Sequence, residues 1–456
     1  MESILNESIE TRLLINGESS SKTFKVVYPY TKQVVAQVQE ADIQDRGIYL
    51  RKLAQLILES NNELAKLETL STGRPISQFF DASAAADSFA YYAGGGWTAQ
   101  GTASLNTPDH LNLTVKQPYG VVALIIPWNF PLVMLAGKLA PAPAAGNAVV
   151  LKSSEKAPLT SLYVAKLIEK AGFPPGVVNI ISGFGNHTGA ALASHMTVRC
   201  ISFTGSTATG QKIQAATAES NMKQVHMELG GKSPAIIFED ADLETAVAQA
   251  QFSIQFNSGQ VCSANSRIYV HESVAKQFVK LFCEKFAAVQ VGDPLDPSTT
   301  HGPQIDLLQY NRIKDYLDIG EKDGTLSLGG DANNGFFVRP TIFEGVDEDS
   351  RLMQEEVFGP VVVINTFSTE TEAIEKANNS EFGLHAAVFT KDIDRAVRSA
   401  KALDAGTVGE NCTSPTNAKD TGFGGFKMSG NGREGLLYSL DSFLETKSIL
   451  IKTARL

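Results

Sequence analysis

The stretch Cys200-Ile201-Ser202-Phe203-Thr204-Gly205-Ser206-Thr207-Ala208-Thr209-Gly210 decides the fold class of this chain. Its apolar first half predicts a buried strand at 200–204, and we expect a helix over 210–219 and a further strand at 224–229. This succession is typical of an α/β domain with a parallel sheet. The turn places small residues at a helix start, where backbone N–H groups can bind an anion. It matches neither G-x-G-x-x-G nor G-x-x-x-x-G-K-[ST], and many such turns serve only for capping.

The same alternation of strands and helices extends in both directions along the chain. Further strands are expected at 115–126, 148–152, 177–181, 234–238, 267–270, 361–364 and 386–389. Further helices are expected at 45–73, 81–92, 132–145, 159–172, 188–194, 243–256, 274–290 and 393–403. Residues 12–37 alternate around Asn16-Gly17, which predicts a small antiparallel meander. Because 456 residues exceed the size of one core, we expect two α/β domains.

Composition excludes several classes of function. A net charge of −10 argues against nucleic acid as a partner, and no apolar run approaches the roughly 18 residues that cross a membrane. The N-terminus lacks the pattern of a secretory signal. The four cysteines are too widely spaced for a disulfide framework or a CxxC metal site, which fits a reducing, cytoplasmic location. The ending Ala454-Arg455-Leu456 loosely matches a peroxisomal tail, a frequent chance occurrence.

Three residues stand in settings that suit catalysis. Cys262 lies in Phe256-Asn257-Ser258-Gly259-Gln260-Val261-Cys262-Ser263, which predicts a tight turn presenting a thiol, although most cysteines are inert packing. Glu228 ends an apolar strand beside two glycines, where a partly desolvated carboxylate can act as a base or simply form an ion pair. Asn129 lies between two prolines in Pro127-Trp128-Asn129-Phe130-Pro131, where its amide suits an oxyanion site or an ordinary turn.

Taken together and in this order, the motifs of this chain resemble the NAD(P)-dependent, hydrolytic aldehyde dehydrogenase superfamily. The resemblance covers nearly the whole chain and rests on these stretches: 127–131, 141–147, 152–155, 203–207, 228–234, 259–262, 355–360 and 424–434. It implies an α/β, aldehyde dehydrogenase-like fold with two Rossmann-type domains plus a small β oligomerisation subdomain. The expected boundaries are 1–102 and 118–230 for the cofactor-binding domain, 231–435 for the catalytic domain, and 103–117 and 436–456 for the oligomerisation hairpin and tail.

The resemblance implies that an aldehyde is oxidised to a carboxylic acid. Cys262 would attack the carbonyl carbon and form a thiohemiacetal, whose oxyanion is held by the Asn129 amide and the Cys262 backbone N–H. Loss of a hydride would leave a thioacyl enzyme, and Glu228 would activate the water that hydrolyses it. A free thiol titrates near 8.5, so a local field is needed to form the thiolate.

The resemblance also implies where cofactor and substrate bind. The expected cofactor contacts are Ile126, Pro127, Trp128, Lys152, Ser154, Glu155, Gly185, Gly189, Phe203, Thr204, Gly205, Ser206, Leu229, Gly230, Glu356 and Phe358. The expected substrate tunnel runs along Phe130, Met134, Gly137, Val261, Ser263 and Phe423, and no metal is implied. Since a carboxylate at 155 would repel a 2′-phosphate, we favour NAD, although Lys152 leaves NADP open. The partners implied are an aldehyde and further copies of the chain in a homodimer or homotetramer.

Three departures from the family pattern stand out, of which the first lies on the outside of the cofactor domain and the other two bear on the substrate. The resemblance implies a further helix of roughly twenty residues before the helix that contains Leu50. This chain has only residues 41–46 there, so that helix is absent. Gly137 and Gly409 stand where many relatives have Trp. The loop 412–421 lacks aromatic residues and Gly422 replaces a common Pro. These changes predict a wider tunnel and a bulky or polar aldehyde, unless Phe130, Phe252, Phe256 or Phe423 fills the space.

Other functions remain open at this stage. One is an NADP-preferring semialdehyde dehydrogenase. Another is a CoA-acylating relative, but those generally lack a base at the position of Glu228. A third, from a different class, is a structural or binding protein of this family without catalytic activity. Loss of Cys262 or Glu228 would indicate such a protein, and both residues are present.

Overall fold

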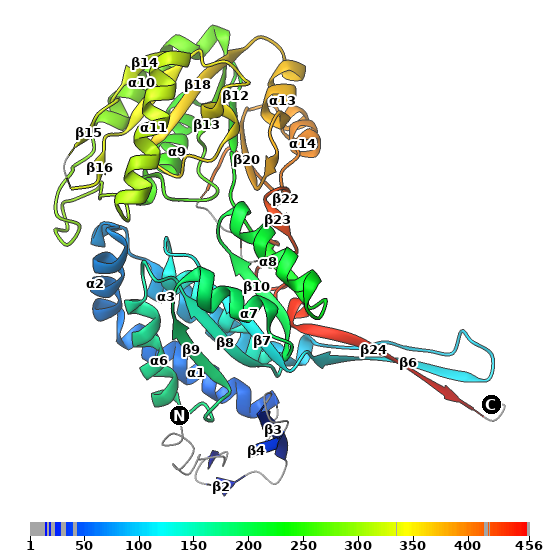
Figure 1. The fold of residues 1–456 in the computed structure, drawn as a ribbon. Helices are drawn as coiled ribbons and strands as arrows, with labels where there is room; N and C mark the ends of the chain where they lie inside the picture. Colours follow the sequence, from blue (N-terminus) through cyan, green and yellow to red (C-terminus); the bar gives the residue numbers. More distant parts are fainter. Residues whose placement is uncertain are drawn as a thin grey trace.

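A computed structural model describes residues 43–333, 335–414, 418 and 420–453, together with the strand segments 14–15, 18–19, 23–28 and 33–39. The chain forms two α/β lobes, and a long two-stranded arm projects from the lower lobe (Figure 1). Each lobe is built around its own sheet, and the two sheets have no strand in common. The Asn16-Gly17 turn and the C-terminal tripeptide lie outside the described residues.

The first sheet has six strands in the order β23-β11-β10-β7-β8-β9. Their bounds are β7 (Val121–Ile125), β8 (Ala148–Ser153), β9 (Val178–Ser182), β10 (Val198–Thr204), β11 (Gln224–Glu228) and β23 (Gly430–Asn431). All neighbours are parallel except β23, which joins β11 in the antiparallel direction. The strand order reverses on either side of β7, so a topological switch point lies between β7 and β10.

Helices and short helical turns accompany the first sheet. They are α1 (Ile43–Glu59), α2 (Asn61–Thr72), η1 (Ile76–Gln78), α3 (Asp81–Gly95), η2 (Gly96–Thr98), α4 (Pro131–Leu139), α5 (Pro141–Ala144), α6 (Leu159–Ala171), η3 (Gly185–Gly189), α7 (Ala190–Ser194) and α8 (Thr207–Glu219). Two expected helices are each divided. The helix expected at 45–73 is interrupted at Ser60. The helix expected at 132–145 is interrupted before Pro141, because proline has no N–H to donate in a helical hydrogen bond.

The second sheet has seven strands in the order β14-β17-β18-β13-β12-β20-β21. Their bounds are β12 (Pro234–Ile237), β13 (Arg267–His271), β14 (Thr325–Leu328), β17 (Thr341–Glu344), β18 (Val361–Phe367), β20 (His385–Phe389) and β21 (Thr407–Glu410). Its helices are α9 (Leu243–Gln255), η4 (Phe256–Gly259), α10 (Glu272–Ala287), α11 (Leu307–Asp323), α12 (Arg351–Gln354), α13 (Glu370–Asn378) and α14 (Ile393–Ala402). Only β14 runs antiparallel to its neighbour, so this lobe is also a parallel α/β unit.

The arm joins two segments that lie far apart in the sequence (Figure 1). β6 (His110–Pro118) and β24 (Leu444–Lys452) pair antiparallel along nine residues, and β5 (Ala103–Ser104) adds a short third strand. The expected oligomerisation hairpin and tail therefore form one continuous sheet within the chain. η5 (Asp441–Phe443) leads into β24.

The remaining strands form small antiparallel pairs. They are β1 (Leu14–Ile15) with β2 (Glu18–Ser19), β3 (Thr23–Tyr28) with β4 (Gln33–Gln39), β15 (Ala332–Asn333) with β16 (Phe337–Val338), and β19 (Phe382–Gly383) with β22 (Phe426–Lys427). The first two pairs confirm the antiparallel strands expected at 12–37. Across the described ranges, no helix is long and apolar enough to span a membrane.

Candidate active site

Most of the expected cofactor residues lie at one edge of the first sheet. They follow the carboxyl ends of four neighbouring strands: Ile126 and Pro127 after β7, Ser154 and Glu155 after β8, Gly205 and Ser206 after β10, and Leu229 and Gly230 after β11. In open parallel sheets, ligands bind in the crevice at this edge beside the switch point. The topology thus brings together residues that are up to a hundred positions apart.

The end of β10 leads into a helix start with a polar cap. Ser206 caps α8, and its hydroxyl accepts a hydrogen bond from the Thr209 backbone N–H at 3.4 Å. Thr204 Oγ1 is buried with no hydrogen-bond partner among the described residues, and Phe203 is buried beneath the turn. A Cβ at Gly205 would approach the Phe203 ring to 2.5 Å, so the turn needs glycine. This arrangement fits a phosphate group at the α8 N-terminus.

Lys152 and Glu155 lie together at the end of β8. Lys152 Nζ is 3.4 Å from Glu155 Oε2, and a Cβ at Gly189 would lie 4.0 Å from the Lys152 chain. Glu155 is exposed while Ser154 is buried. Gly185 is exposed at the opposite end of η3 from Gly189, so the two expected glycines occupy different environments.

Glu356 and Phe358 reach across from the second lobe. The Gly231 backbone N–H donates to Glu356 Oε1 at 3.0 Å, and a Cβ at Gly230 would approach Glu356 Oε2 to 2.4 Å. The Trp128 and Phe358 rings meet edge to face with their centroids 5.3 Å apart. The glycine pair after Glu228 therefore allows the close approach of the two lobes at this site.

The turn before Cys262 has an unusual backbone. Asn257, Ser258 and Gly259 have φ angles of 49°, 52° and 76°, and left-handed conformations at non-glycine residues cost about 1–3 kcal/mol each. A Cβ at Gly259 would lie 2.1 Å from the Gly359 carbonyl carbon, so this position requires glycine. The turn is therefore a strained segment whose conformation the surrounding structure must hold.

Hydrogen bonds from three directions hold this turn. The Asn257 backbone N–H donates to Gln78 Oε1 at 3.0 Å, and Ser258 Oγ donates to the Gly302 carbonyl at 2.8 Å. Asn129 Nδ2 donates to the Gln260 carbonyl at 3.0 Å, while Asn257 Nδ2 donates to the Asn129 carbonyl at 3.1 Å. Asn129 is thus tied in both directions to the loop that carries Cys262.

The Cys262 thiol lies within electrostatic reach of the carboxyl groups of Glu228 and Glu356. Burial raises the pKa of the Cys262 thiol, and the nearby carboxylates of Glu228 and Glu356 raise it further. Burial also raises the pKa of Glu228 well above its ordinary value, with Glu434 adding to the effect, and raises the pKa of Glu356 to about 7. Carboxyl groups with raised pKa values can exchange protons near neutral pH, which is the property that a general base needs.

Lys138, Ser202 and Glu434 form a polar cluster near Glu228 for which the sequence predicts no role. Lys138 Nζ hydrogen-bonds Glu434 and also donates to Ser202 Oγ at 2.9 Å. Lys138 lowers the pKa of Glu228 while Glu434 raises it, so both lie within electrostatic reach of the expected base. The signal in the sequence was a lone lysine within the otherwise apolar stretch 132–145.

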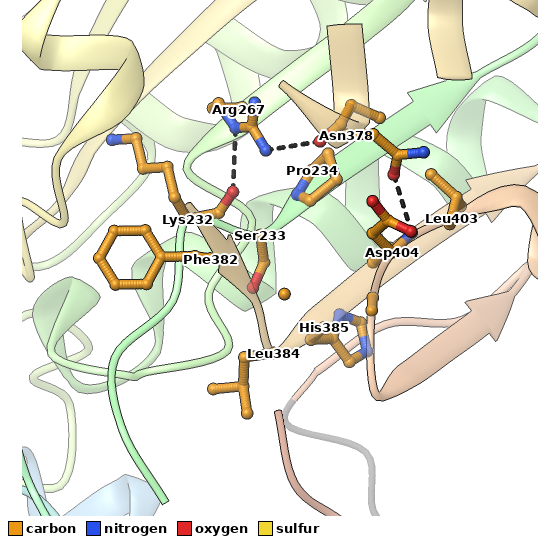
Figure 2. A pocket seen from close by; sticks show the side chains of 14 residues that line it. Lys232, Ser233, Pro234, Arg267, Asn378, Phe382, Leu384, His385, Leu403 and Asp404 are labelled. Carbon is orange, nitrogen blue, oxygen red and sulfur yellow. Dashed lines mark hydrogen bonds between the residues drawn. The ribbon is translucent and has the colours of Figure 1, made fainter. Parts of the chain in front are cut away.

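Another residue without a sequence-based role is Lys232. Burial and the neighbouring Arg267 lower the pKa of Lys232 to about 7, whereas Glu356 opposes that shift. Lys232 also lines the small cavity shown in Figure 2, together with Ser233, Arg267 and His385. That cavity has about 10 Å³, room for one water molecule, and the buried Ser233 Oγ and His385 Nδ1 have no partners among the described residues. It suits a structural water.

The expected tunnel residues occupy contrasting surroundings. Phe130 stacks on Phe256 at 5.8 Å, and Phe256 also contacts Phe252 and Phe80. Met134 packs between the cores of the two lobes, Val261 and Ser263 are buried beside Cys262, and Phe423 is half-buried. Phe130, Phe256, Phe252 and Phe80 therefore form one cluster of contacting rings.

The two glycines that stand in place of Trp differ from each other. No described heavy atom lies within 4 Å of a Cβ built on Gly137, which faces open space. The cavity beside it has polar walls from Lys138, Ser202, His226, Glu434 and Ser439. At Gly409 the expectation of free space is wrong, because a Cβ there would lie 2.3 Å from the Cys412 carbonyl oxygen. Positions 415–417 and 419 of the aromatic-free loop lie outside the described residues.

A group of metal ligands is not present in the part of the chain that the structure describes. No three side chains among His, Cys, Asp and Glu gather there in a way that could hold an ion. The four cysteines are all free thiols, and only Cys200 is fully buried.

Comparison with known proteins agrees with this geometry. Residues 32–449 match the family described as "Aldehyde dehydrogenase family". The chain is 45% identical to human retinal dehydrogenase 2, covering 97% of this chain and 92% of that protein. It is 44% identical to the mitochondrial aldehyde dehydrogenase of Equus caballus, covering 98% and 96%.

Solved structures give the same result for the fold. The betaine aldehyde dehydrogenase of Staphylococcus aureus, solved in complex with NAD+, has a TM-score of 0.88 and 37% identity, covering 99% of this chain and 96% of that one. The α/β fold expected from the sequence is confirmed at full length. The chain therefore belongs to the aldehyde dehydrogenase family.

Proposed function

We propose that this protein oxidises a bulky or polar aldehyde to its carboxylic acid with NAD, using Cys262 as nucleophile, Glu228 as base and Asn129 as oxyanion donor. The reaction class, NAD-dependent oxidation of an aldehyde, follows from the family. The observation that carries the residue roles is the mutual hydrogen bonding of Asn129 with the Cys262 loop, beside two carboxyl groups that couple to the thiol.

The Cys262 thiol, whose pKa is raised by burial and by the neighbouring carboxylates, first loses its proton to water, and the resulting thiolate adds to the carbonyl carbon. The carbonyl oxygen gains the negative charge, and the Asn129 Nδ2 and the Cys262 backbone N–H donate hydrogen bonds to it. Because Asn129 is buried and fixed by Gln260 and Asn257, its amide needs little reorganisation as charge develops. NAD, when bound, accepts the hydride that the thiohemiacetal loses.

The second half of the reaction hydrolyses the thioester on Cys262. Glu228 takes a proton from water, the resulting hydroxide adds to the acyl carbon, and the Cys262 thiolate leaves as the acid forms. Glu228 is buried and one of its oxygens, Oε1, has no partner among the described residues, so it is free to hold a water. Its raised pKa makes it a stronger base than an exposed glutamate.

The residues at the sheet edge fit a dinucleotide. Ser206 and the α8 N-terminus would hold the pyrophosphate, Lys152 and Glu155 the adenosine ribose, and Glu356 with Phe358 the nicotinamide side. The fit is supported by the unpartnered, buried Thr204 hydroxyl and by the close approach at Gly205. The NAD+ complexes of similar dehydrogenases support the same cofactor.

Replacing Glu155 with glutamine should raise kcat/KM for NADP relative to NAD by about tenfold. The carboxylate is exposed beside Lys152, and removing one negative charge near a 2′-phosphate relieves repulsion of about 1–2 kcal/mol. Steady-state kinetics with both cofactors measures the ratio. Glu169→Gln, on the exposed face of α6, is the control and should leave it unchanged. An unaltered ratio in Glu155→Gln would show that Glu155 does not face the ribose.

The size and polarity of the aldehyde are inferred from the region around Gly137. A side chain at this glycine would meet open space, and the i, i+4, i+7 spacing of Phe130, Met134 and Gly137 favours a common side for the three at the start of α4. Similar proteins are named for retinal, betaine aldehyde and indole-3-acetaldehyde, all larger than acetaldehyde. The cluster of contacting rings formed by Phe130, Phe256 and Phe252 would offer apolar contact to such a substrate.

The Gly137→Trp substitution should shift specificity toward small aldehydes. An indole at this position would fill the open space, so kcat/KM for bulky aldehydes should fall by about tenfold or more relative to acetaldehyde. Measurement of kcat/KM across a size series checks this. Gly94→Ala, at an exposed position of α3 where a Cβ meets no described atom, is the matched control. Equal losses for all sizes would contradict a tunnel position for Gly137.

The proposed function is tested with purified protein, a panel of aldehydes and each nicotinamide cofactor. NADH formation that rises with substrate bulk or polarity supports the proposal. Highest activity on acetaldehyde, falling steadily with size, would overturn the substrate assignment. Acyl-CoA instead of free acid as product would favour a CoA-acylating enzyme, and no turnover of any aldehyde would favour a non-catalytic role.

The arm supports assembly into a homodimer or homotetramer. β24 is exposed along most of its length, with Leu450 68% exposed, and an apolar strand of this kind is normally covered by another chain. We propose that the protein is located in the cytoplasm. The tripeptide Ala454-Arg455-Leu456 makes the peroxisome the alternative location. Similar proteins include a mitochondrial enzyme, so fluorescence imaging of the tagged chain, with and without its last three residues, decides among them.

A further inference from the structure

A cluster of three buried charged residues lies behind the active site. Glu68 in α2, Arg74 in the following turn and Asp81 at the start of α3 are 0%, 2% and 0% exposed. The Arg74 guanidinium hydrogen-bonds Asp81 Oδ2 and lies 3.6 Å from Glu68 Oε1. Burying such a group is costly, and a hydrophobic replacement is often at least as stable. Stability alone therefore gives little reason for a charged cluster here.

Glu68 contacts the first turn of α4. Its Oε1 accepts from the Leu132 backbone N–H at 3.4 Å, and its Oε2 accepts from Thr160 Oγ1 at 2.7 Å. α4 begins at Pro131, which has no N–H, and is preceded by Phe130, which cannot cap a helix. Leu132 carries the first backbone donor of this helix, and Glu68 satisfies it from 64 residues away.

Arg74 contacts the residue before that turn. Its guanidinium carbon lies 4.8 Å from the centre of the Phe130 ring, which stacks on Phe256 at the start of the catalytic turn. Phe130 directly follows Asn129 in the chain. The cluster therefore holds the backbone immediately after the oxyanion donor on two sides, through Leu132 and through Phe130.

We propose that Glu68, supported by Arg74, is a positioning residue that fixes the first turn of α4 and thereby aims the Asn129 amide at the oxyanion formed on Cys262. This inference rests on the proposed function. Glu68 contacts Leu132, Thr160 and Arg74, so it acts through Asn129 without touching the reacting atoms. Burial, with Asp81 adding to it, raises the pKa of Glu68 to about 8.

A double-mutant cycle between Glu68 and Asn129 tests the proposal. Asn129→Ala should lower kcat by about 10²–10³-fold, as loss of one oxyanion donor does elsewhere. We expect Glu68→Ala to lower kcat about tenfold with KM nearly unchanged, and to have no further effect in the Asn129→Ala background. Glu68→Gln should restore most of the rate because it keeps an acceptor for Leu132. Glu63→Ala, at an exposed carboxylate of the same helix, is the control and should match the wild type.

A second readout separates this inference from the proposed function. Acylation of Cys262 by p-nitrophenyl acetate forms a tetrahedral oxyanion on the same thiol, expels p-nitrophenolate and needs no cofactor. The double-mutant cycle of Glu68→Ala and Asn129→Ala is repeated with the rate of the p-nitrophenolate burst as the measured quantity. Non-additive effects there support the role of Glu68 even if no aldehyde were oxidised. Additive effects of Glu68→Ala and Asn129→Ala, or a wild-type rate in a folded Glu68→Ala, would overturn it, as would a folded Glu68→Gln that is no faster than Glu68→Ala.

Discussion

Replacing Cys262 with alanine should reduce aldehyde oxidation by about 10⁴-fold or more while leaving NAD binding nearly intact. The thiol forms the covalent bond on which both halves of the reaction depend, so no neighbouring group can replace it. Its loss leaves the loop backbone in place, because Asn129, Asn257 and Gln260 hold that loop without using the thiol. NADH formation measures turnover, and calorimetric titration with NAD measures binding.

The control for this substitution is another cysteine of the same chain. Cys283, half-buried on α10, can be replaced by alanine without touching the proposed site, and that variant should keep the wild-type rate. Substantial turnover by Cys262→Ala would refute covalent catalysis by this thiol. Loss of NAD binding together with activity would instead indicate that the substitution disrupts the fold.

Replacing Glu228 with glutamine should separate the two halves of the reaction. Thiohemiacetal formation and hydride loss do not need the base, so the variant should release about one NADH per active site in a burst. Steady-state turnover should fall by about 10²–10⁴-fold because the thioester is no longer hydrolysed with general-base help. Stopped-flow absorbance and mass spectrometry of the acylated enzyme measure these two quantities.

The pH dependence of the wild type should report the same residue. Glu228 acts as a base only when ionised, and burial raises its pKa. Hydrolysis should therefore decline as the pH falls through that raised pKa, and Glu228→Gln should lack this limb of the profile. A Glu228→Gln variant with an unchanged steady-state rate and no burst would assign the base to another group. Glu244→Gln, exposed in the first turn of α9, controls for the loss of a carboxylate.

Much of the fold could be predicted because its signals are local. The buried strands at 148–152, 200–204 and 361–364 are apolar runs with short connections, and all appear in the two parallel sheets. Helices α11 and α13 were not predicted, although Asp306 and Thr369 cap them as sequence rules would allow. Both helices are on average more polar than most of the predicted ones, so few apolar positions mark their buried faces.

The parts that could not be predicted depend on the tertiary structure. Asn257 and Ser258 adopt left-handed backbones that their residue types do not announce, since glycine is the usual sign of that conformation. The contact of Glu68 with the α4 N-terminus joins positions 64 residues apart, and no local pattern links them. Gly409 looked like free space only because the position of the Cys412 carbonyl could not be known.

The antiparallel pairing of β23 with β11 has a consequence for how the protein is made. Met227 and Asn431, which hydrogen-bond across this pair, are 204 residues apart. At translation rates of about 5–20 residues per second, β11 waits roughly 10–40 s on the ribosome for its outer neighbour. Throughout that time the strand that ends in Glu228 is an open sheet edge, the kind of surface that associates with other nascent chains. The covered edge of β11, and with it the fixed backbone beside Glu228, therefore forms only after residues 430–431 have been made.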